Sequence, residues 1–223
     1  MSGQKALPYS KIADVLQKIE GLEWATSLDL NMGYYTVHLD LYSQQLCTIV
    51  TPWGKYQYLR LPMGVNVSPD VFQEKMSSLM QDLEYVRTYL DDLLVISNGS
   101  FEEHLQQLGK VLQRLRRAGL KINAEKSSFF APEIEYLGYL LTKDGIKPVQ
   151  KKIQAVLDLQ PPTTLKELRS FLGMVQFYRD MWKQRSHILA PLTDLVGEGK
   201  KKIKWESKHQ ESFERIKKVL AKE

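Results

Sequence analysis

The feature that most constrains this chain is a pair of adjacent carboxylates, Asp91 and Asp92, between two short apolar runs that favour β-structure. The runs extend from Tyr85 to Leu90 and from Leu93 to Ile96. Neighbouring side chains on a regular strand point to opposite faces, so a strand would separate the two carboxylates. A tight turn between antiparallel strands brings them together, and aspartate is tolerated in turns. The pattern predicts a β-hairpin with an acidic tip, and a motif this short indicates nothing more on its own.

A third carboxylate, Asp29, ends another strand-like run that begins at Trp24. Proteins hold Mg²⁺ with one or two carboxylates, and water and phosphate oxygens complete its octahedral shell. Two such ions about 3.5–4 Å apart activate a hydroxyl nucleophile and stabilise a departing pyrophosphate. The three carboxylates therefore indicate a two-metal site for Mg²⁺, with Mn²⁺ as a substitute. Asp29 and Asp91 are expected to be the main ligands. Asp92 is expected to act partly on the surroundings of those ligands rather than on the ions directly.

Length and composition are typical of a soluble globular protein. The 223 residues are 43% hydrophobic and 26% charged, which allows one large domain or two to three small ones. No run approaches the roughly 18 apolar residues of a membrane span, so no membrane partner is expected. The single cysteine, Cys47, excludes an internal disulfide and fits a reducing compartment. The four histidines are scattered, which argues against a zinc site.

The net charge of +5 is unevenly distributed. Residues 1–100 hold 7 basic and 11 acidic side chains, whereas residues 101–223 hold 24 basic and 15 acidic ones. The basic half is either an ordinary solvated surface or a track for a phosphate backbone.

Periodicity in the first half predicts helices and hairpins around the acidic tip. A helix is expected from Ser10 to Gly21, and a hairpin around residues 52–55. A helix follows that starts at Ser68, with the Ser68 hydroxyl as its cap and Pro69 in its first turn. After the acidic hairpin, Ser100 and Glu103 predict a capping box for a helix that stops at Gly119. A sheet between helices in this order is an α+β sandwich.

The second half is expected to be mainly helical. Residues 133–141 alternate as a strand, Asp144-Gly145 forms a turn, and residues 150–159 form a helix. Thr164 and Glu167 predict a capping box for the next helix. Residues 187–196 and 207–220 are further helices, separated by a lysine-rich loop at residues 200–202.

Five sequence pieces, in order and at matching spacing, resemble the reverse transcriptases of gypsy-like LTR retrotransposons and of retroviruses. They are Leu28-Asp29-Leu30 with Gly33-Tyr34, Leu61-Pro62-Met63-Gly64 with Ser68-Pro69 and Phe72-Gln73, Tyr89-Leu90-Asp91-Asp92, Tyr136-Leu137-Gly138-Tyr139, and Phe171-Leu172-Gly173-Met174. The resemblance implies an α+β polymerase palm, an antiparallel sheet backed by helices, followed by a mainly helical thumb and connection. It places the palm at residues 1–120 and the end of the palm, the primer-grip hairpin and the start of the thumb at 121–160. The helical thumb and partial connection then occupy 161–223.

The resemblance also implies a nucleotide site. Tyr34 would stack under the incoming sugar and block a 2′-hydroxyl, the group that separates ribonucleotides from deoxyribonucleotides. The alternative for Tyr34 is a core aromatic, with the adjacent Tyr35 able to take its place. Met63 and Gly64 would lie beside the new base pair, since glycine permits close backbone approach and methionine packs on apolar surfaces.

Two further contacts with nucleic acid follow from the same resemblance. Leu137 and Gly138 fall where the family grips the primer strand, the alternative being a plain hairpin strand. A basic segment would contact backbone phosphates, or else be a solvated helix face. Its main residues are Arg114, Arg116, Arg117 and Lys121, with Lys110 and Lys126 beside them.

The resulting prediction is a retroelement RNA-directed DNA polymerase, a nucleotidyltransferase that adds deoxynucleoside triphosphates to a primer on an RNA or DNA template. The family's β-rich fingers segment has no counterpart before Asp29, and no ribonuclease H segment follows. Both would then belong to a larger polyprotein, in an intracellular particle in the cytoplasm or nucleus. The alternative is a retroelement remnant that binds nucleic acid or serves as a structural module without efficient catalysis. A third possibility, an RNA-templated RNA polymerase, shares the palm but accounts for neither Tyr34 nor the retroelement-like helix around Phe171.

Overall fold

The computed structural model describes residues 21–178, 185–197 and 203–221. The chain divides into two compact units, residues 1–146 and 147–223. The helix expected from Ser10 and the loop at residues 200–202 lie outside the described residues. Within the described ranges, no helix combines the length and the apolar character needed to cross a membrane.

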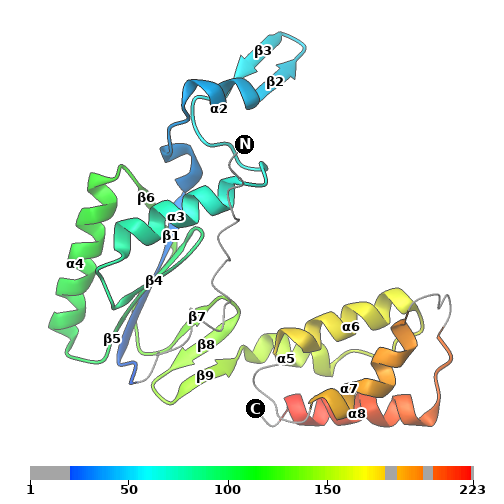
Figure 1. The fold of residues 1–223 in the computed structure, drawn as a ribbon. Helices are drawn as coiled ribbons and strands as arrows, with labels where there is room; N and C mark the ends of the chain where they lie inside the picture. Colours follow the sequence, from blue (N-terminus) through cyan, green and yellow to red (C-terminus); the bar gives the residue numbers. More distant parts are fainter. Residues whose placement is uncertain (1–20, 179–184, 198–202, 222–223) are drawn as a thin grey trace. The chain divides into compact units, whose positions relative to one another are not determined.

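The first unit is built on a four-stranded antiparallel sheet of order β4-β5-β1-β6, as Figure 1 shows. Its strands are β1 (Trp24–Asn31), β4 (Val86–Tyr89), β5 (Asp92–Ser97) and β6 (Lys121–Ala131). β4 and β5 form the acidic hairpin predicted from the sequence. β1 lies in the middle of the sheet, between β5 and β6, so both of its backbone edges are engaged.

Two helices, α3 (Ser68–Met80) and α4 (Phe101–Arg117), cover one face of this sheet. Side chains on a strand alternate between the faces. Leu28 of β1 and Leu93 of β5 therefore join Phe72 of α3 and Val111 of α4 in the main apolar core. This helix-covered face also contains a fully buried His104, whose ring is hydrogen-bonded to Thr26 Oγ1 at 2.8 Å and to Ser97 Oγ at 2.7 Å.

The opposite face of the sheet packs against a second, smaller sheet. Ala25 and Leu94 form an apolar cluster there with Ile134, Tyr136 and Leu141. The smaller sheet has the order β7-β8-β9, with β7 (Ile134–Tyr136), β8 (Tyr139–Thr142) and β9 (Gly145–Pro148). The single strand expected over residues 133–141 is wrong. The structure breaks it at Leu137 and Gly138, whose φ angles of 50° and 84° fit a two-residue hairpin turn.

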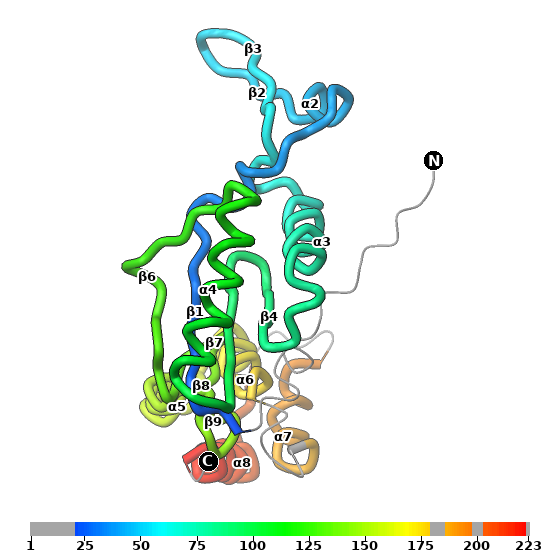
Figure 2. The backbone as a smooth tube through the Cα atoms, turned by 90° about the vertical axis from the view of Figure 1, so that its left-hand side faces the viewer, coloured from blue at the N-terminus to red at the C-terminus, as the bar shows by residue number. Residues whose placement is uncertain are grey.

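A small projection precedes α3. It consists of the 3₁₀ helix η1 (Gly33–Thr36), α2 (Leu41–Leu46), β2 (Thr48–Thr51) and β3 (Gly54–Gln57). The β2–β3 hairpin matches the prediction, whereas α2 has no counterpart in it. Figure 2 shows α2 and the hairpin extending beyond the end of the sheet.

The serines at the starts of α3 and α4 were both expected to cap their helices, and only Ser100 does so. The structure starts α3 at Ser68 after Val67, without a side-chain cap, and the Ser68 hydroxyl donates to Pro62 O at 2.7 Å. The capping role expected for Ser68 is therefore wrong, because its hydroxyl already serves the preceding loop. At α4, Ser100 Oγ accepts the Glu103 N–H at 3.2 Å, which is only one half of the predicted capping box. Glu103 Oε1 instead accepts from Gln107 Nε2 at 3.3 Å.

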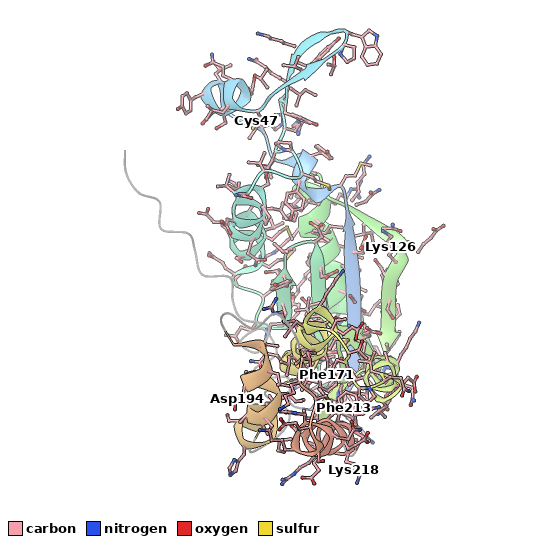
Figure 3. The ribbon with its side chains drawn as sticks, turned by 90° about the vertical axis from the view of Figure 1, so that its right-hand side faces the viewer. Cys47, Lys126, Phe171, Asp194, Phe213 and Lys218 are labelled. Carbon is pink, nitrogen blue, oxygen red and sulfur yellow. The ribbon has the colours of Figure 1, made fainter. Side chains whose placement is uncertain are left out.

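The second unit is helical. Its elements are α5 (Gln150–Leu157), α6 (Leu165–Phe177), α7 (Arg185–Thr193), the 3₁₀ helix η2 (Asp194–Val196) and α8 (Ser207–Leu220). Thr164 and Glu167 form the predicted capping box of α6. The core of the unit centres on Phe171 and Phe213, whose ring centroids are 4.8 Å apart, and Figure 3 labels both.

Candidate active site

The three predicted carboxylates lie at one end of the central sheet. Asp29 and Asp92 are directly paired across the β1–β5 ladder. Because Leu28 and Leu93 point toward the helices, Asp29 and Asp92 point to the opposite face. Asp91 lies in the turn before β5, and its carbonyl accepts the Leu30 N–H at 3.0 Å. The fold thus brings the expected residues together from two strands and one turn.

Gln73 of α3 holds the turn that carries Asp91. Its Oε1 accepts the Leu90 N–H at 2.7 Å, and its Nε2 lies 3.3 Å from Thr88 O. Leu90 has a φ of 52°, a left-handed conformation that is costly for a branched side chain. A side chain that bonds both flanks of this residue therefore keeps the strained turn in place. Sequence reasoning missed this role: Gln73 belongs to one of the pieces that carry the resemblance, but nothing in that piece predicts a partner 17 residues away.

The carboxylates interact electrostatically. Burial, followed by the charges of Asp92 and Asp29, raises the pKa of Asp91 above its ordinary value. Burial and the charge of Asp29 raise the pKa of Asp92 as well. One oxygen of Asp91, Oδ1, is buried and has no hydrogen-bond partner among the residues that the structure describes. An acidic cluster with an unpaired buried oxygen is chemically suited to a hard cation.

The side chains do not form a ready-made metal cage. Across the described ranges, no three His, Cys, Asp or Glu side chains lie close enough to hold one ion.

Tyr34 lies in the core beside this site. Its ring stacks on Phe72 with 4.8 Å between the centroids, and only 8% of the residue is exposed. Burial and the nearby charge of Asp91 raise the pKa of its phenol. Gly33 leaves room for this stack, because a Cβ there would lie 2.5 Å from Phe72 Cζ. Tyr34 is therefore a core aromatic that also interacts with a site carboxylate, whereas Tyr35 is exposed.

Met63 and Gly64 lie in the loop between β3 and α3. Met63 is 51% exposed. Gly64 has a φ of 92°, and a Cβ there would have no atom of the described residues within 4 Å. The hydrogen bond from Ser68 Oγ to Pro62 O anchors this loop to the start of α3.

Leu137 and Gly138 form the β7–β8 turn, and the strand before them contacts the acidic hairpin. The Tyr136 hydroxyl lies 3.3 Å from Asp92 O, as the donor of a hydrogen bond. Burial is the main cause of a strongly raised pKa of Tyr136, so its phenol keeps the proton that it donates.

The basic residues expected to contact phosphates are divided between α4 and β6. Arg114, Arg116 and Arg117 belong to the last turn of α4, on the sheet face opposite to the one that carries Asp29 and Asp92. The Arg114 guanidinium pairs with both carboxylate oxygens of Asp82 and donates to Leu79 O at 2.9 Å. Lys121 starts β6 opposite Asn31, at the same end of the sheet as Asp29.

Comparisons with known proteins agree with this arrangement. The family model described as "Reverse transcriptase (RNA-dependent DNA polymerase)" matches residues 3–141. The retrovirus-related Pol polyprotein from transposon opus of Drosophila melanogaster is 35% identical over 191 residues, which are 85% of this chain and 19% of that protein. The corresponding polyprotein from transposon gypsy is 28% identical over 228 residues, covering 97% of this chain and 22% of the relative.

Solved structures show the same likeness. The foamy viral protease-reverse transcriptase in complex with an RNA/DNA hybrid matches 99% of this chain and 30% of its own, with a TM-score of 0.85 and 27% identity. The same viral protein in complex with double-stranded DNA matches with a TM-score of 0.88 over 98% of this chain and 46% of its own. The chain spans about a fifth of the length of the curated relatives named above.

Proposed function

Because this chain belongs to the reverse transcriptase (RNA-dependent DNA polymerase) family, we propose that it is the polymerase part of a retroelement polyprotein. It transfers deoxynucleotides from their triphosphates to a primer 3′-hydroxyl, on an RNA or DNA template. The observation that carries this proposal is the pairing of Asp29 with Asp92 across the ladder, with Asp91 in the adjoining turn.

Asp29, Asp91 and Asp92 are the residues that would hold two Mg²⁺ ions, or Mn²⁺ in their place. Bound there, such ions supply activation of the primer hydroxyl and stabilisation of the departing pyrophosphate. The raised pKa values of Asp91 and Asp92 and the unpaired Asp91 Oδ1 support this role, because a cation relieves repulsion among the carboxylates. Gln73 contributes by holding the turn between Leu90 and Asp91.

The nucleotide would lie beside Tyr34, Met63 and Gly64. Tyr34 suits a steric limit on the sugar because its stack on Phe72 fixes the ring, so the ring does not yield to a 2′-hydroxyl. The exposed Met63 and the open space at Gly64 are available to a base pair. The core position of Tyr34 and its place beside the substrate are compatible, since a buried ring can present one edge to the site.

The primer strand would contact the turn at Leu137 and Gly138, which the hydrogen bond from Tyr136 to Asp92 ties to the catalytic hairpin. Lys121 lies at the same end of the sheet and is the best placed of the basic residues for backbone phosphates. Arg116 and Arg117 would serve a phosphate chain that passes the other face, and Arg114 is already paired with Asp82. Residues 1–120 then correspond to the palm. Residues 121–160 correspond to the end of the palm, the primer-grip hairpin and the start of the thumb, and residues 161–223 to the helical thumb and partial connection.

The second candidate function is a nucleic-acid-binding or structural module without efficient catalysis, and the observation that favours it is the exposed projection that contains α2, β2 and β3. Several of its large apolar side chains are exposed, and Trp53 is 83% exposed. Patches of this kind mark surfaces that a partner covers. We propose that the partner that covers this surface is the fingers segment of a longer polyprotein. The same polyprotein would also contain the ribonuclease H segment, and it would act in an intracellular retroelement particle. A chain kept without that segment would be a nucleic-acid-binding or structural module without efficient catalysis.

Primer extension separates these two functions. The full chain is incubated with an RNA template, a labelled DNA primer, deoxynucleotides and Mg²⁺, beside the Asp91→Asn variant. Loss of a preorganised charge typically costs about 10²–10³ in rate, so Asp91→Asn should abolish measurable extension. Asp158→Asn, at the exposed C-cap of α5, is the matched control and should extend normally. A wild-type chain that binds the duplex without extending it supports the non-catalytic module instead.

A further inference from the structure

β6 does not run regularly beside β1. Ser27 is paired with Ser128, but Asp29, two residues further along β1, is paired with Asn123, five residues back along β6. The ladder is therefore interrupted by a large bulge over residues 124–127. Bulges are over-represented next to active sites, where they re-aim a side chain or end the pairing of two strands.

The bulge meets the backbone of Asp29. The Leu30 N–H points toward the acidic hairpin, where it donates to Asp91 O. Successive backbone amides of a strand point to opposite sides, so the Asp29 N–H points toward β6. Its acceptor there is a side chain rather than a backbone carbonyl: the Asp29 N–H donates to Ser127 Oγ at 3.1 Å.

The Ser127 hydroxyl is itself fixed in direction. It donates its only proton to Asn123 O at 2.6 Å, which leaves a lone pair for the Asp29 amide. The side chain of Asn123 holds the bulge from within, since its Oδ1 accepts the Glu125 N–H at 3.2 Å. Three residues of β6 thus form a hydrogen-bonded support beside one residue of β1.

We propose that Ser127 is a positioning residue for the catalytic carboxylate of Asp29. Its hydroxyl holds the Asp29 backbone from the β6 side while Asp92 is paired with Asp29 from the β5 side, and this sets where the Asp29 carboxylate meets a cation. The inference rests on the proposed function of the three carboxylates as metal ligands. Nothing in the sequence around Ser127 signals this role, because 98 residues separate it from Asp29.

The test measures cation binding rather than polymerisation. The full chain is titrated with Mn²⁺, and the free ion is followed by electron paramagnetic resonance. Ser127→Ala removes the acceptor for the Asp29 amide and should weaken Mn²⁺ binding by about threefold to tenfold, the range of one net hydrogen bond. Ser127→Thr keeps a hydroxyl and should bind nearly as wild type does. Ser128→Ala, at the adjacent position on the same strand, is the matched control.

The Asp29→Asn variant distinguishes a failure of this inference from a failure of the proposed function. Weak binding by both Asp29→Asn and Ser127→Ala, with Ser127→Thr and Ser128→Ala near wild type, supports the positioning role. Weak binding by Asp29→Asn with unchanged binding by Ser127→Ala overturns the positioning role and leaves the metal site standing. Wild-type binding by Asp29→Asn, or no Mn²⁺ binding by the wild-type chain, overturns the metal assignment and the inference with it.

Amide hydrogen exchange supplies a second readout in case Ser127→Ala lowers overall stability. The Asp29 amide should exchange faster in Ser127→Ala, while the Leu30 amide, which is bonded to Asp91 O, keeps its protection. Equal exchange of the Asp29 amide in both proteins would mean that Ser127 does not hold it, and would overturn the proposal whatever the melting temperature.

Discussion

Asp29 and Asp92 are direct partners across an antiparallel ladder, two like charges at a position where proteins ordinarily place apolar or oppositely charged pairs. The raised pKa of Asp92, which burial and the charge of Asp29 cause, shows that the ionised pair is unfavourable in the folded chain. The concentration of negative charge at this end of the sheet therefore lowers the stability of the folded chain.

The first prediction concerns this cost. Because the pKa of Asp92 is raised, its ionised form at pH 7 destabilises the fold, and the neutral Asp92→Asn should be more stable without metal. Relief of one like-charge pair is worth up to about 1 kcal/mol, or roughly 2–4 °C in the melting temperature of a chain this size. Calorimetry without divalent ions checks it, with Asp158→Asn as control. A lower melting temperature for Asp92→Asn would contradict it.

Gln73 provides the second prediction. Gln73→Leu keeps the volume of the side chain but loses the bonds to Leu90 and Thr88, so the strained turn should loosen. Extension should slow by about tenfold or more, with a loss of stability of roughly 1–2 kcal/mol. Single-turnover extension and the hydrogen exchange of the Leu90 amide measure both effects. Gln81→Leu, at the C-cap of the same helix, should change neither.

The third prediction tests the basic residues. If the chain binds a primer-template through six to ten phosphates, affinity should fall by about 10³–10⁵ between 50 and 200 mM salt. Each lysine or arginine that contacts a phosphate adds roughly 0.9 to the slope of log affinity against log salt. Fluorescence anisotropy should therefore give a smaller slope for Lys121→Ala. An unchanged slope for Arg116→Ala would mean that the α4 face does not take part.

His104 provides a prediction on pH. Burial lowers its pKa, so the folded chain keeps the imidazole neutral at pH values where the unfolded chain, with a pKa near 6.5, takes up a proton. The stability that neutral His104 contributes is complete above about pH 6.5 and is lost as the pH falls below that value. Urea unfolding between about pH 5.5 and 7.5 should show this loss. His104→Gln should flatten the profile, whereas the exposed His187→Gln should keep it.

The fifth prediction concerns the apolar projection. Fusion of the upstream fingers segment of a related polyprotein should cover Trp53 and shift its fluorescence to the blue. It should also lower the nucleotide concentration needed for extension, because positioning of this kind accounts for up to about 7–11 kcal/mol of a barrier. Trp53→Phe should remove the spectral shift. Fast extension at micromolar nucleotide by residues 1–223 alone would contradict the need for that segment.

Local signals in the sequence were sufficient for much of this structure. The acidic hairpin, the cap at Ser100, the capping box at Thr164 and helix α8 were all predicted, because each depends on residues within a few positions of one another. The resemblance to gypsy-like reverse transcriptases is confirmed by the family model and by the polyprotein relatives.

Other features depended on distant partners and could not be predicted. The Ser68 hydroxyl has the chemistry of a cap, but Pro62 O lies within its reach and takes the hydrogen bond. The turn at Leu137 needs a positive φ that leucine rarely adopts, so the run from residue 133 to 141 reads as one strand. Gln73 and Ser127 support the site across 17 and 98 residues respectively, and periodicity contains no information on such pairs.

The central place of β1 has a consequence for the order in which the chain folds. β1 leaves the ribosome before both of its neighbours in the sheet, β5 at residues 92–97 and β6 at residues 121–131. Loop closure over such distances is slow, so folding should be limited by these late pairings. Until β6 emerges, the backbone N–H and C=O groups on one edge of β1 remain open to pairing with other chains. A nascent chain arrested before residue 121 should therefore aggregate, whereas one extended past residue 131 should be able to complete the sheet.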